Sequence, residues 1–176
     1  MDKLTELSIG MGTTGAVANE FIGLSEQQHV GITNMKLVKL MYIAQGLSLA
    51  LLDRPIFEND KIEAWKYGPV VPSIYHEFKH FKSEPITTKS VVTLDSEWEN
   101  LSEPKLTDEE DKKIVLLTWR LYKDMSPRDL VDLTHRAGTP WSLTYEDSES
   151  NIIDNELIKR YYDQFVVNLD NHLRSA

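Results

Sequence analysis

Residues 33 to 52 read TNMKLVKLMYIAQGLSLALL, and this stretch decides the fold. Its apolar side chains recur three, four and seven positions apart, which is the period of one face of an α-helix. They are Leu37, Leu40, Met41, Ala44, Leu47 and Leu51. The spacing predicts a helix with one apolar stripe that the rest of the fold must cover. It places Lys36, Lys39 and Gln45 on the opposite, polar side.

The residues beside this helix predict where it begins and ends. Thr33 and Asn34 carry side-chain oxygens that can cap the free N–H groups of a first helical turn. Pro55 ends the helix, because proline biases its predecessor away from helical geometry. Upstream, apolar residues at helical spacing predict a short helix over residues 16–27. Glycines among small residues predict a flexible N-terminal arm over residues 1–13.

Two segments are rich in β-forming residues. Residues 62–67 predict a short strand that Gly68-Pro69 closes, and residues 90–94 predict a second strand that can pair with it. Pro72 suits the first turn of a following helix, where its missing N–H is harmless. Two strands alone are marginally stable, so this sheet must lean on helices.

The C-terminal half predicts three further helices. Residues 107–110 form a capping box for the first, in which a threonine and a glutamate each satisfy a free backbone N–H. Ser126 caps a second helix that runs to about Arg136. After a turn at Pro140-Trp141, Asp154 opens the last helix.

These elements predict an α+β protein that is predominantly α-helical, a compact helical domain with a small two- or three-stranded antiparallel sheet. The chain has 176 residues, of which 41% are hydrophobic and 27% charged, so it can bury one core. We expect a single domain over residues 14–170. Its 19 basic and 28 acidic residues give a net charge of −9, which disfavours nucleic acid and favours a basic protein as partner.

Other features concern the compartment. The chain has no cysteine, which fits a reducing environment. Its first residues include acids where a secretory signal has a basic end and an apolar block. Residues 47–52 form the longest apolar stretch, far short of the roughly 20 residues that cross a bilayer. We therefore expect a cytoplasmic protein with no membrane partner.

One enzymatic motif is present at residues 76–80, which read HEFKH and match H-E-x-x-H. Histidines four positions apart on a helix share a face and can both ligate zinc, which leaves Glu77 to act as a base on a metal-bound water. The third ligand would have to come from Glu97, Glu99 or Glu103, in a stretch predicted as strand end and loop. We favour the alternative interpretation, in which both histidines, His76 and His80, lie on the solvated side of the helix.

A second polar cluster contains Asp132, Thr134, His135 and Arg136, where a histidine beside a carboxylate can transfer protons. Asp132 and His135 are i and i+3 neighbours, however, which is typical of an ordinary pair at a helix end. The sequence has no glycine-rich phosphate loop and no G-x-S-x-G motif. It predicts a protein that is not an enzyme and needs no cofactor or metal.

The remaining candidate site is aromatic. Aromatic side chains bury a large area at low entropic cost, so they are common in cores and are the usual anchors of protein interfaces. Several lie beside turns that contain glycine or proline, and rigid turns that present aromatics suit recognition. The candidate partner-binding residues are Trp65, Tyr67, Gly68, Pro69, Tyr75, His135 and Trp141.

Three segments together resemble the Panacea domain, the SocA-like antitoxin family that includes phage-associated proteins. They are residues 32–46, ITNMKLVKLMYIAQG; residues 62–72, IEAWKYGPVVP, followed by Tyr75-His76; and Leu133-Thr134-His135-Arg136 with Pro140-Trp141. The resemblance covers residues from about 16 to 145. The order of WKYGPV after KLMYIAQG makes it specific.

The resemblance implies a mostly helical domain with a small sheet, found in antitoxins that neutralise unrelated toxins, in several cases by direct contact. We therefore predict an antitoxin that binds a cognate toxin protein. Three alternatives stay open: an adaptor that delivers the toxin to a protease or chaperone, a transcriptional autoregulator, and a zinc hydrolase. The autoregulator is disfavoured because its reading helix would offer only Arg128 and Arg136 beside two aspartates.

Overall fold

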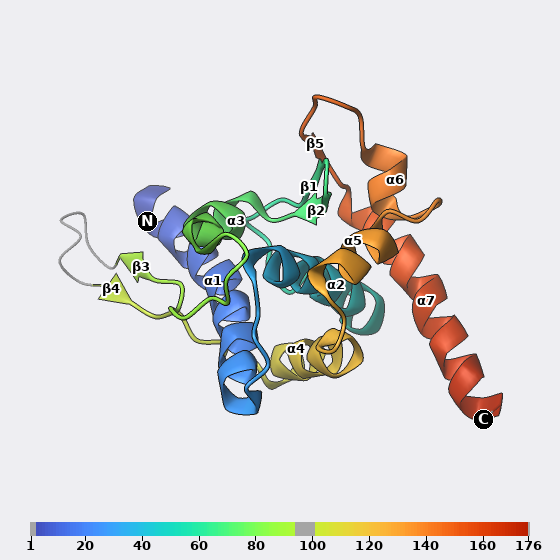
Figure 1. The fold of residues 1–176 in the computed structure, drawn as a ribbon, viewed down its shortest axis with the longest axis horizontal. Coiled ribbons are helices and arrows are strands. Elements are labelled where there is room, and N and C mark those ends of the chain that lie inside the picture. The colour runs from blue at the N-terminus through green and yellow to red at the C-terminus, as the bar shows by residue number, and fades with distance from the viewer. Residues whose placement is uncertain (1–2, 94–100, 176) are drawn as a thin grey trace.

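The computed structural model describes residues 3–93 and 101–175 (Figure 1). Its helices are α1 (Lys3–Gln28), α2 (Asn34–Leu52), α3 (Pro72–Phe78), the 3-10 helix η1 (Lys79–Phe81), α4 (Glu109–Tyr122), α5 (Pro127–Thr134), α6 (Pro140–Thr144) and α7 (Asn155–Ser175). Its strands are β1 (Glu63–Trp65), β2 (Gly68–Val70), β3 (Val92–Thr93), β4 (Leu101–Ser102) and β5 (Asn151–Ile152). The predicted class is confirmed: the protein is predominantly helical, with a small three-stranded antiparallel sheet.

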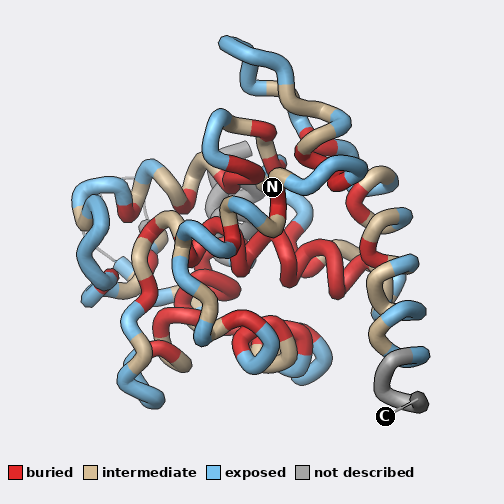
Figure 2. Tube along the Cα trace, turned by 45° about the vertical axis from the view of Figure 1, so that its right-hand side comes forward, coloured by how far each residue is buried: buried red, intermediate tan, exposed pale blue. Residues whose placement is uncertain are grey.

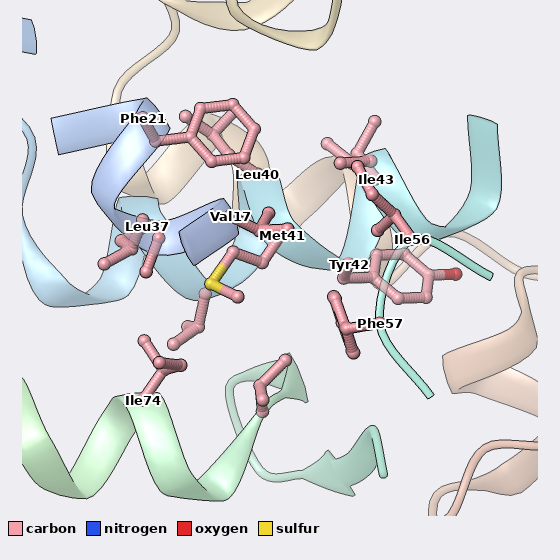
Figure 3. Close-up of a cluster of buried hydrophobic side chains, with 14 of the residues drawn as sticks. Val17, Phe21, Leu37, Leu40, Met41, Tyr42, Ile43, Ile56, Phe57 and Ile74 are labelled. Atoms are coloured by element: carbon pink, nitrogen blue, oxygen red, sulfur yellow. The ribbon is translucent and has the colours of Figure 1, made fainter. Parts of the chain in front are cut away.

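Helix α2 lies at the centre of the molecule, and other elements cover it on every side. α7 and α4 pack along it, and α1, α3, α5 and β2 contact it as well. Figure 2 shows the buried residues gathered in this middle region, and Figure 3 shows Val17 and Phe21 of α1 in one cluster with Met41 of α2. Because no face of α2 is left open, the helix needs partners for its polar side chains as well as its apolar ones.

The predicted polar side of α2 is therefore wrong. Lys36, Lys39 and Gln45 are all buried, whereas Leu51, which was placed on the apolar stripe, is 45% exposed. The periodicity located the helix correctly but underestimated how much of its surface the fold covers. Leu51 is exposed because it lies in the last turn, where α2 reaches the edge of the body.

Gln45 shows how a polar side chain is accommodated in this core. Its Oε1 accepts hydrogen bonds from the backbone N–H groups of Ile56 (3.0 Å) and Phe57 (3.3 Å). Its Nε2 donates to the Phe57 carbonyl (3.3 Å) and to Oδ1 of Asn155 (3.3 Å). The amide thus fixes the loop after α2 and the start of α7, which explains why a polar group is stable there.

Helix α1 begins much earlier than predicted. Residues 3–13, expected as a flexible arm, belong to one continuous helix that starts at Lys3, not at Ala16. Glycine lowers helix stability by about 1 kcal/mol relative to alanine, which weakened the sequence signal. Once the buried part of α1 is packed, adding further turns is cooperative and no longer bears the cost of nucleation.

The three-stranded sheet has the order β2-β1-β5. β1 and β2 form a hairpin with Trp65 opposite Gly68, so residues 66–67 form its two-residue turn. The predicted strand over residues 62–67 is too long at its C-terminal end, and Gly68-Pro69 belongs to the partner strand. β5, which the sequence did not indicate, pairs with the other edge of β1, placing Ile152 opposite Glu63.

The predicted second strand does not join this sheet. Val92-Thr93 pairs with Leu101-Ser102 in a separate two-stranded ribbon, and Leu94 lies outside the described residues. The reason is that Gly68-Pro69-Val70 follows β1 closely enough to pair as a hairpin, and short-range pairing loses less loop entropy. Asn19 of α1 holds the approach to the ribbon, because its Nδ2 donates to the Ser90 carbonyl at 3.0 Å.

Helix caps were predicted with mixed success. Ser126 caps α5 as expected and forms a capping box with Asp129. Helix α4 begins one residue later than predicted, because Asp108 and not Thr107 accepts hydrogen bonds from the first turn. The predicted turn at Pro140 is the start of a short helix, α6, which Thr139 caps.

Helix α7 makes the most extensive contact with α2. The two helices touch at Gly46, where a Cβ atom would lie 2.2 Å from the ring of Tyr162. Tyr162 is buried and meets Tyr42 edge to face with ring centroids 5.9 Å apart. Beyond this contact, the second half of α7 extends away from the body (Figures 1 and 2).

Among the described residues, α2 is the one helix whose length and composition would allow it to cross a membrane. Of its most apolar window, 78% is buried inside the protein. A core helix that is mostly buried meets the same test of length and composition.

The close contact at Gly46 gives a stability prediction. Gly46→Ala places a methyl group inside the Tyr162 ring, and overpacking of this kind costs about 1–3 kcal/mol, which exceeds the roughly 1 kcal/mol that alanine gains in a helix. We expect a lower free energy of unfolding in urea. The matched control is Gly23→Ala in α1, where the nearest atom lies 3.8 Å from the new Cβ, and it should be neutral or stabilising. Equal effects of the two substitutions would contradict this account of the α2–α7 contact.

Candidate functional site

The β1–β2 hairpin rests directly on α2 and α5. Gly68 adopts a φ of +101°, a conformation that favours glycine. A Cβ atom there would lie 2.7 Å from Cε of Lys39 and 2.9 Å from Oγ1 of Thr134. Gly68 is therefore needed both for its backbone angle and for the close approach of the hairpin to two helices.

Lys39 connects the core to this hairpin. Its Nζ donates to the Pro69 carbonyl at 3.0 Å and lies 3.6 Å from the sulfur of Met35. The side chain is fully buried, and burial lowers the pKa of the amine from 10.5 to about 7. A lysine held in this way acts as a hydrogen-bond donor to the hairpin backbone, and it loses its proton far more easily than an amine in water.

The His135–Trp141 region braces the hairpin from the other side. Nε1 of Trp141 donates to the Trp65 carbonyl at 2.8 Å. The rings of His135 and Trp141 stack with centroids 3.7 Å apart and an angle of 2° between their planes. Tyr145 stacks next in line at 4.7 Å from Trp141. The rings of Trp141 in α6 and of the residues that follow α5 and α6 thus form one stack against β1.

A second aromatic group covers Trp65 itself. Its ring meets Tyr75 edge to face at 5.1 Å and lies 5.8 Å from the ring of His76, both from α3. Its Nε1 donates to Oε2 of Glu63 at 2.7 Å, so the indole is fixed by polar contacts as well. Asn34 holds α3 in place, because its Nδ2 donates to the Tyr75 carbonyl at 3.0 Å.

The seven candidate residues come together around the hairpin, but they differ in accessibility. Gly68, Pro69 and Trp141 are buried, and Trp65, Tyr75 and His135 are half-buried. Tyr67 at the hairpin turn is 58% exposed, with the Lys66 amine 5.7 Å from its ring centroid. We call the β1–β2 hairpin together with Tyr75, His135 and Trp141 the hairpin platform. Its buried members support the hairpin, and Tyr67 is the most exposed of the seven candidate residues.

Sequence reasoning missed several residues around this platform. Lys39, Thr139 and Tyr145 belonged to no candidate site, whereas His76 and Thr134 were singled out in other motifs but not as members of this one. Lys39 was placed on the wrong side of α2, and no local signal indicates that a lysine will donate to a carbonyl thirty residues away. Tyr145 could have been found, because it stands four positions after Trp141, a spacing that brings side chains together on a helix.

Both histidines of the H-E-x-x-H motif are exposed, as the solvated-side interpretation predicted, and Glu77 is half-buried. Glu77 accepts hydrogen bonds from Oγ of Ser90 (2.9 Å) and from the Val91 backbone (3.2 Å), although burial raises its pKa. α3 ends at Phe78, so the two histidines do not share one continuous α-helix. Within residues 13–93 and 101–171, whose side chains the structure describes, no group of three metal-binding side chains is close enough to hold an ion.

The three glutamates suggested as a third zinc ligand do not support the zinc interpretation. Glu103 is exposed, and Glu97 and Glu99 lie outside the described residues.

His135 occupies the C-terminal end of α5 and not an open acid–base site. Its backbone N–H donates to the Val131 carbonyl at 3.0 Å, and its ring lies flat on Trp141. Burial lowers its pKa, and the nearby Lys39 charge adds to that effect, while Asp132 opposes it. These contacts hold the ring as part of the aromatic stack.

Comparison with known proteins identifies the family. Residues 37–142 match the family described as "Antitoxin SocA-like, Panacea domain". The chain belongs to this SocA-like antitoxin family. Antitoxin SocA of Caulobacter vibrioides (strain NA1000 / CB15N) is 32% identical to it over 140 residues, which make up 78% of this chain and 72% of that protein. No solved structure gives a significant match.

The resemblance predicted from the sequence is thus confirmed, and family membership supports an antitoxin role and a toxin partner in general. The matched Panacea segment, residues 37–142, contains most of α2, the hairpin, α5 and Trp141. α1 and α7 lie entirely outside it, yet both pack against α2. The Panacea core of this antitoxin-family protein is therefore completed by helices that the family match does not include.

The buried amine of Lys39 predicts a pH dependence of stability. Between about pH 7 and its ordinary pKa of 10.5, the Lys39 amine is protonated in the unfolded chain but not in the folded protein. Raising the pH in this range therefore favours the folded state. Below about pH 7 both states bind the proton and the effect stops. We expect the urea midpoint to rise from pH 7 to about pH 9.5, and to rise less in Lys39→Met.

The matched control is Lys105→Met, which changes an exposed lysine and should leave the slope as in the parent protein. The range stops below pH 10 because burial raises the pKa of Tyr42 and Tyr162, which reverses the trend at higher pH. An unchanged slope in Lys39→Met would show that this amine keeps an ordinary pKa in the folded protein.

Proposed function

We propose that the protein is an antitoxin that neutralises its cognate toxin by binding it directly, with the hairpin platform as the contact surface. One observation carries the proposal. Within the family-matched residues 37–142, Trp65, Tyr75, His135 and Trp141 brace the hairpin, and Tyr67 at its turn is exposed to solvent. The proposal assigns no catalytic step and no cofactor to the chain, and it places the encounter in the cytoplasm.

Rigidity of the hairpin supports this role. Trp65 is held by the Trp141 hydrogen bond at its carbonyl and by Tyr75 at its ring, and Lys39 holds the next strand. A surface that is already ordered loses little conformational entropy when a partner binds, so more of the contact energy appears as affinity. Aromatic side chains in such settings are the usual centres of binding energy.

The first experiment tests the neutralisation itself. The chain is produced together with the protein encoded by the adjacent gene, and growth is compared with that of cells producing either protein alone. The proposal expects the neighbour to be toxic alone and harmless in combination. With both proteins purified, stoichiometric inhibition of the toxin should occur without any protease. Neutralisation that needs a protease would instead indicate an adaptor that delivers the toxin for degradation.

The second experiment tests the surface. Tyr67→Ala should weaken binding of the purified toxin by roughly 30-fold or more, because truncating an interface anchor costs about 2 kcal/mol. Its folding should be unaffected, since Tyr67 is 58% exposed. The matched control is Leu121→Ala, a 40% exposed residue of α4 on the opposite side of the body (Figure 1). Equal loss in both variants, measured by calorimetry, would exclude the hairpin as the contact surface.

A further inference from the structure

The outer surface of the three-stranded sheet leaves apolar side chains open to solvent. Directly paired residues of antiparallel strands point to the same face, so Ile152 and Glu63 share one face and Trp65, two positions along, joins them. Ala64 takes the other face and is fully buried. Ile152 is 56% exposed, and Tyr67 on the adjoining hairpin turn is 58% exposed. Trp65 is half-buried, with Tyr75 and His76 of α3 against its ring. We call Trp65, Tyr67 and Ile152 the outer sheet surface.

An acidic segment adjoins this surface. The connection from α6 to β5 stands above the sheet in Figure 1, and it continues through β5 into the start of α7. From residue 137 to residue 158 the sequence contains no lysine or arginine. Its exposed acids are Glu146, Asp147, Glu149, Asp154 and Glu156. All five lie in the described part of the chain, and none of them forms an ion pair there.

The polar contacts of these carboxylates involve no basic side chain among the described residues. Asp147 accepts a hydrogen bond from the Tyr145 hydroxyl at 3.2 Å, and Asp154 caps the backbone N–H of Glu156 at 2.7 Å. Lys66 lies in the hairpin turn with its amine near the ring of Tyr67, and Lys61 precedes β1. The surface as a whole is therefore apolar in the middle and negative along one side.

We infer that the outer sheet surface and the adjoining acidic segment bind a lysine- and arginine-rich segment of the partner protein. Such side chains match both halves of the surface. Their aliphatic stems pack on Ile152 and Trp65, arginine stacks on aromatic rings, and the cationic ends reach the carboxylates. The inference rests on the proposed function for the identity of the partner, the toxin, and adds the chemistry of the segment that docks.

Charge complementarity favours this occupant over the other candidates. A second copy of the chain in a two-fold contact would bring the acidic segment against itself. Nucleic acid and anionic lipid would be repelled for the same reason. A cationic protein segment is the partner for which the field of this surface speeds encounter and the apolar centre supplies contact area.

The test uses two matched triple variants of the full chain. The first, Glu146→Gln with Asp147→Asn and Glu149→Gln, removes three charges from the acidic segment. The control, Glu84→Gln with Glu103→Gln and Glu109→Gln, removes three exposed charges elsewhere. The probe is a fluorescent peptide of alternating arginine and leucine, with a peptide of alternating glutamate and leucine as its counterpart. Fluorescence anisotropy measures binding at low and at high salt.

We expect the basic peptide to bind the parent protein with an affinity that falls as salt rises. The first triple variant should lose roughly tenfold in affinity, whereas the control should stay within about twofold of the parent. Ile152→Ser should weaken binding at high salt as well, because it removes apolar contact. Equal loss in both triple variants would overturn the inference in favour of net charge alone, and tighter binding of the acidic peptide would also overturn it.

Measurement with the toxin separates the two proposals. If the toxin binds the first triple variant as tightly and as quickly as it binds the parent, the antitoxin role stands and the docking inference fails. If the adjacent gene product does not bind the parent at all, the proposed function fails, and the peptide experiment still decides whether this surface takes basic segments.

Discussion

The structure depends on the burial of α2, in which every residue from Lys36 to Leu49 is buried. A helix covered on every side stabilises the fold through its apolar residues, but it also forces each of its polar side chains to find a partner inside the protein. Gln45 binds the loop that follows α2 and the start of α7, and Lys36 donates to the Lys123 carbonyl at the end of α4. Lys39 donates to Pro69 in the hairpin. The polar residues of α2 thus fix the positions of four separate segments, and the packing of the core and the placement of the candidate site have one physical origin.

The same constraint explains why the hairpin can be a platform for binding. A hairpin as short as β1–β2 has little stability of its own. Here it is held from below by Lys39, from one side by the Trp141 indole and from the other by α3. The close approach is possible because Gly68 has no side chain to collide with Lys39 and Thr134. Bracing of this kind leaves the backbone fixed while the Tyr67 side chain remains exposed, which is the combination that preorganised recognition requires.

The family match and the structure divide the chain differently. The Panacea segment, residues 37–142, includes the platform, but the core closes only when α1 and α7 pack on α2. The acidic connection between α6 and β5 and the strand β5 follow the matched segment, and they lie beside the platform. A shared domain that presents the aromatic platform is thereby joined to a neighbouring segment whose charge differs from it. In the proposed function, the platform is the contact surface and the acidic segment adds a local electrostatic preference.

Sequence alone determined the fold class, the extent of α2, the caps at Thr33 and Ser126, and the family to which the chain belongs, because helical periodicity and capping are local properties. It also selected seven residues that the structure brings around one hairpin. Only the tertiary structure decided that Lys36, Lys39 and Gln45 are buried, that β1 pairs with β2 and β5, and that Trp141 binds the Trp65 backbone. Each of these depends on a group that arrives from a remote part of the chain. A periodic pattern shows which side chains share a face of one helix, but it cannot show which faces other elements will cover, since that is set by the packing of the whole core.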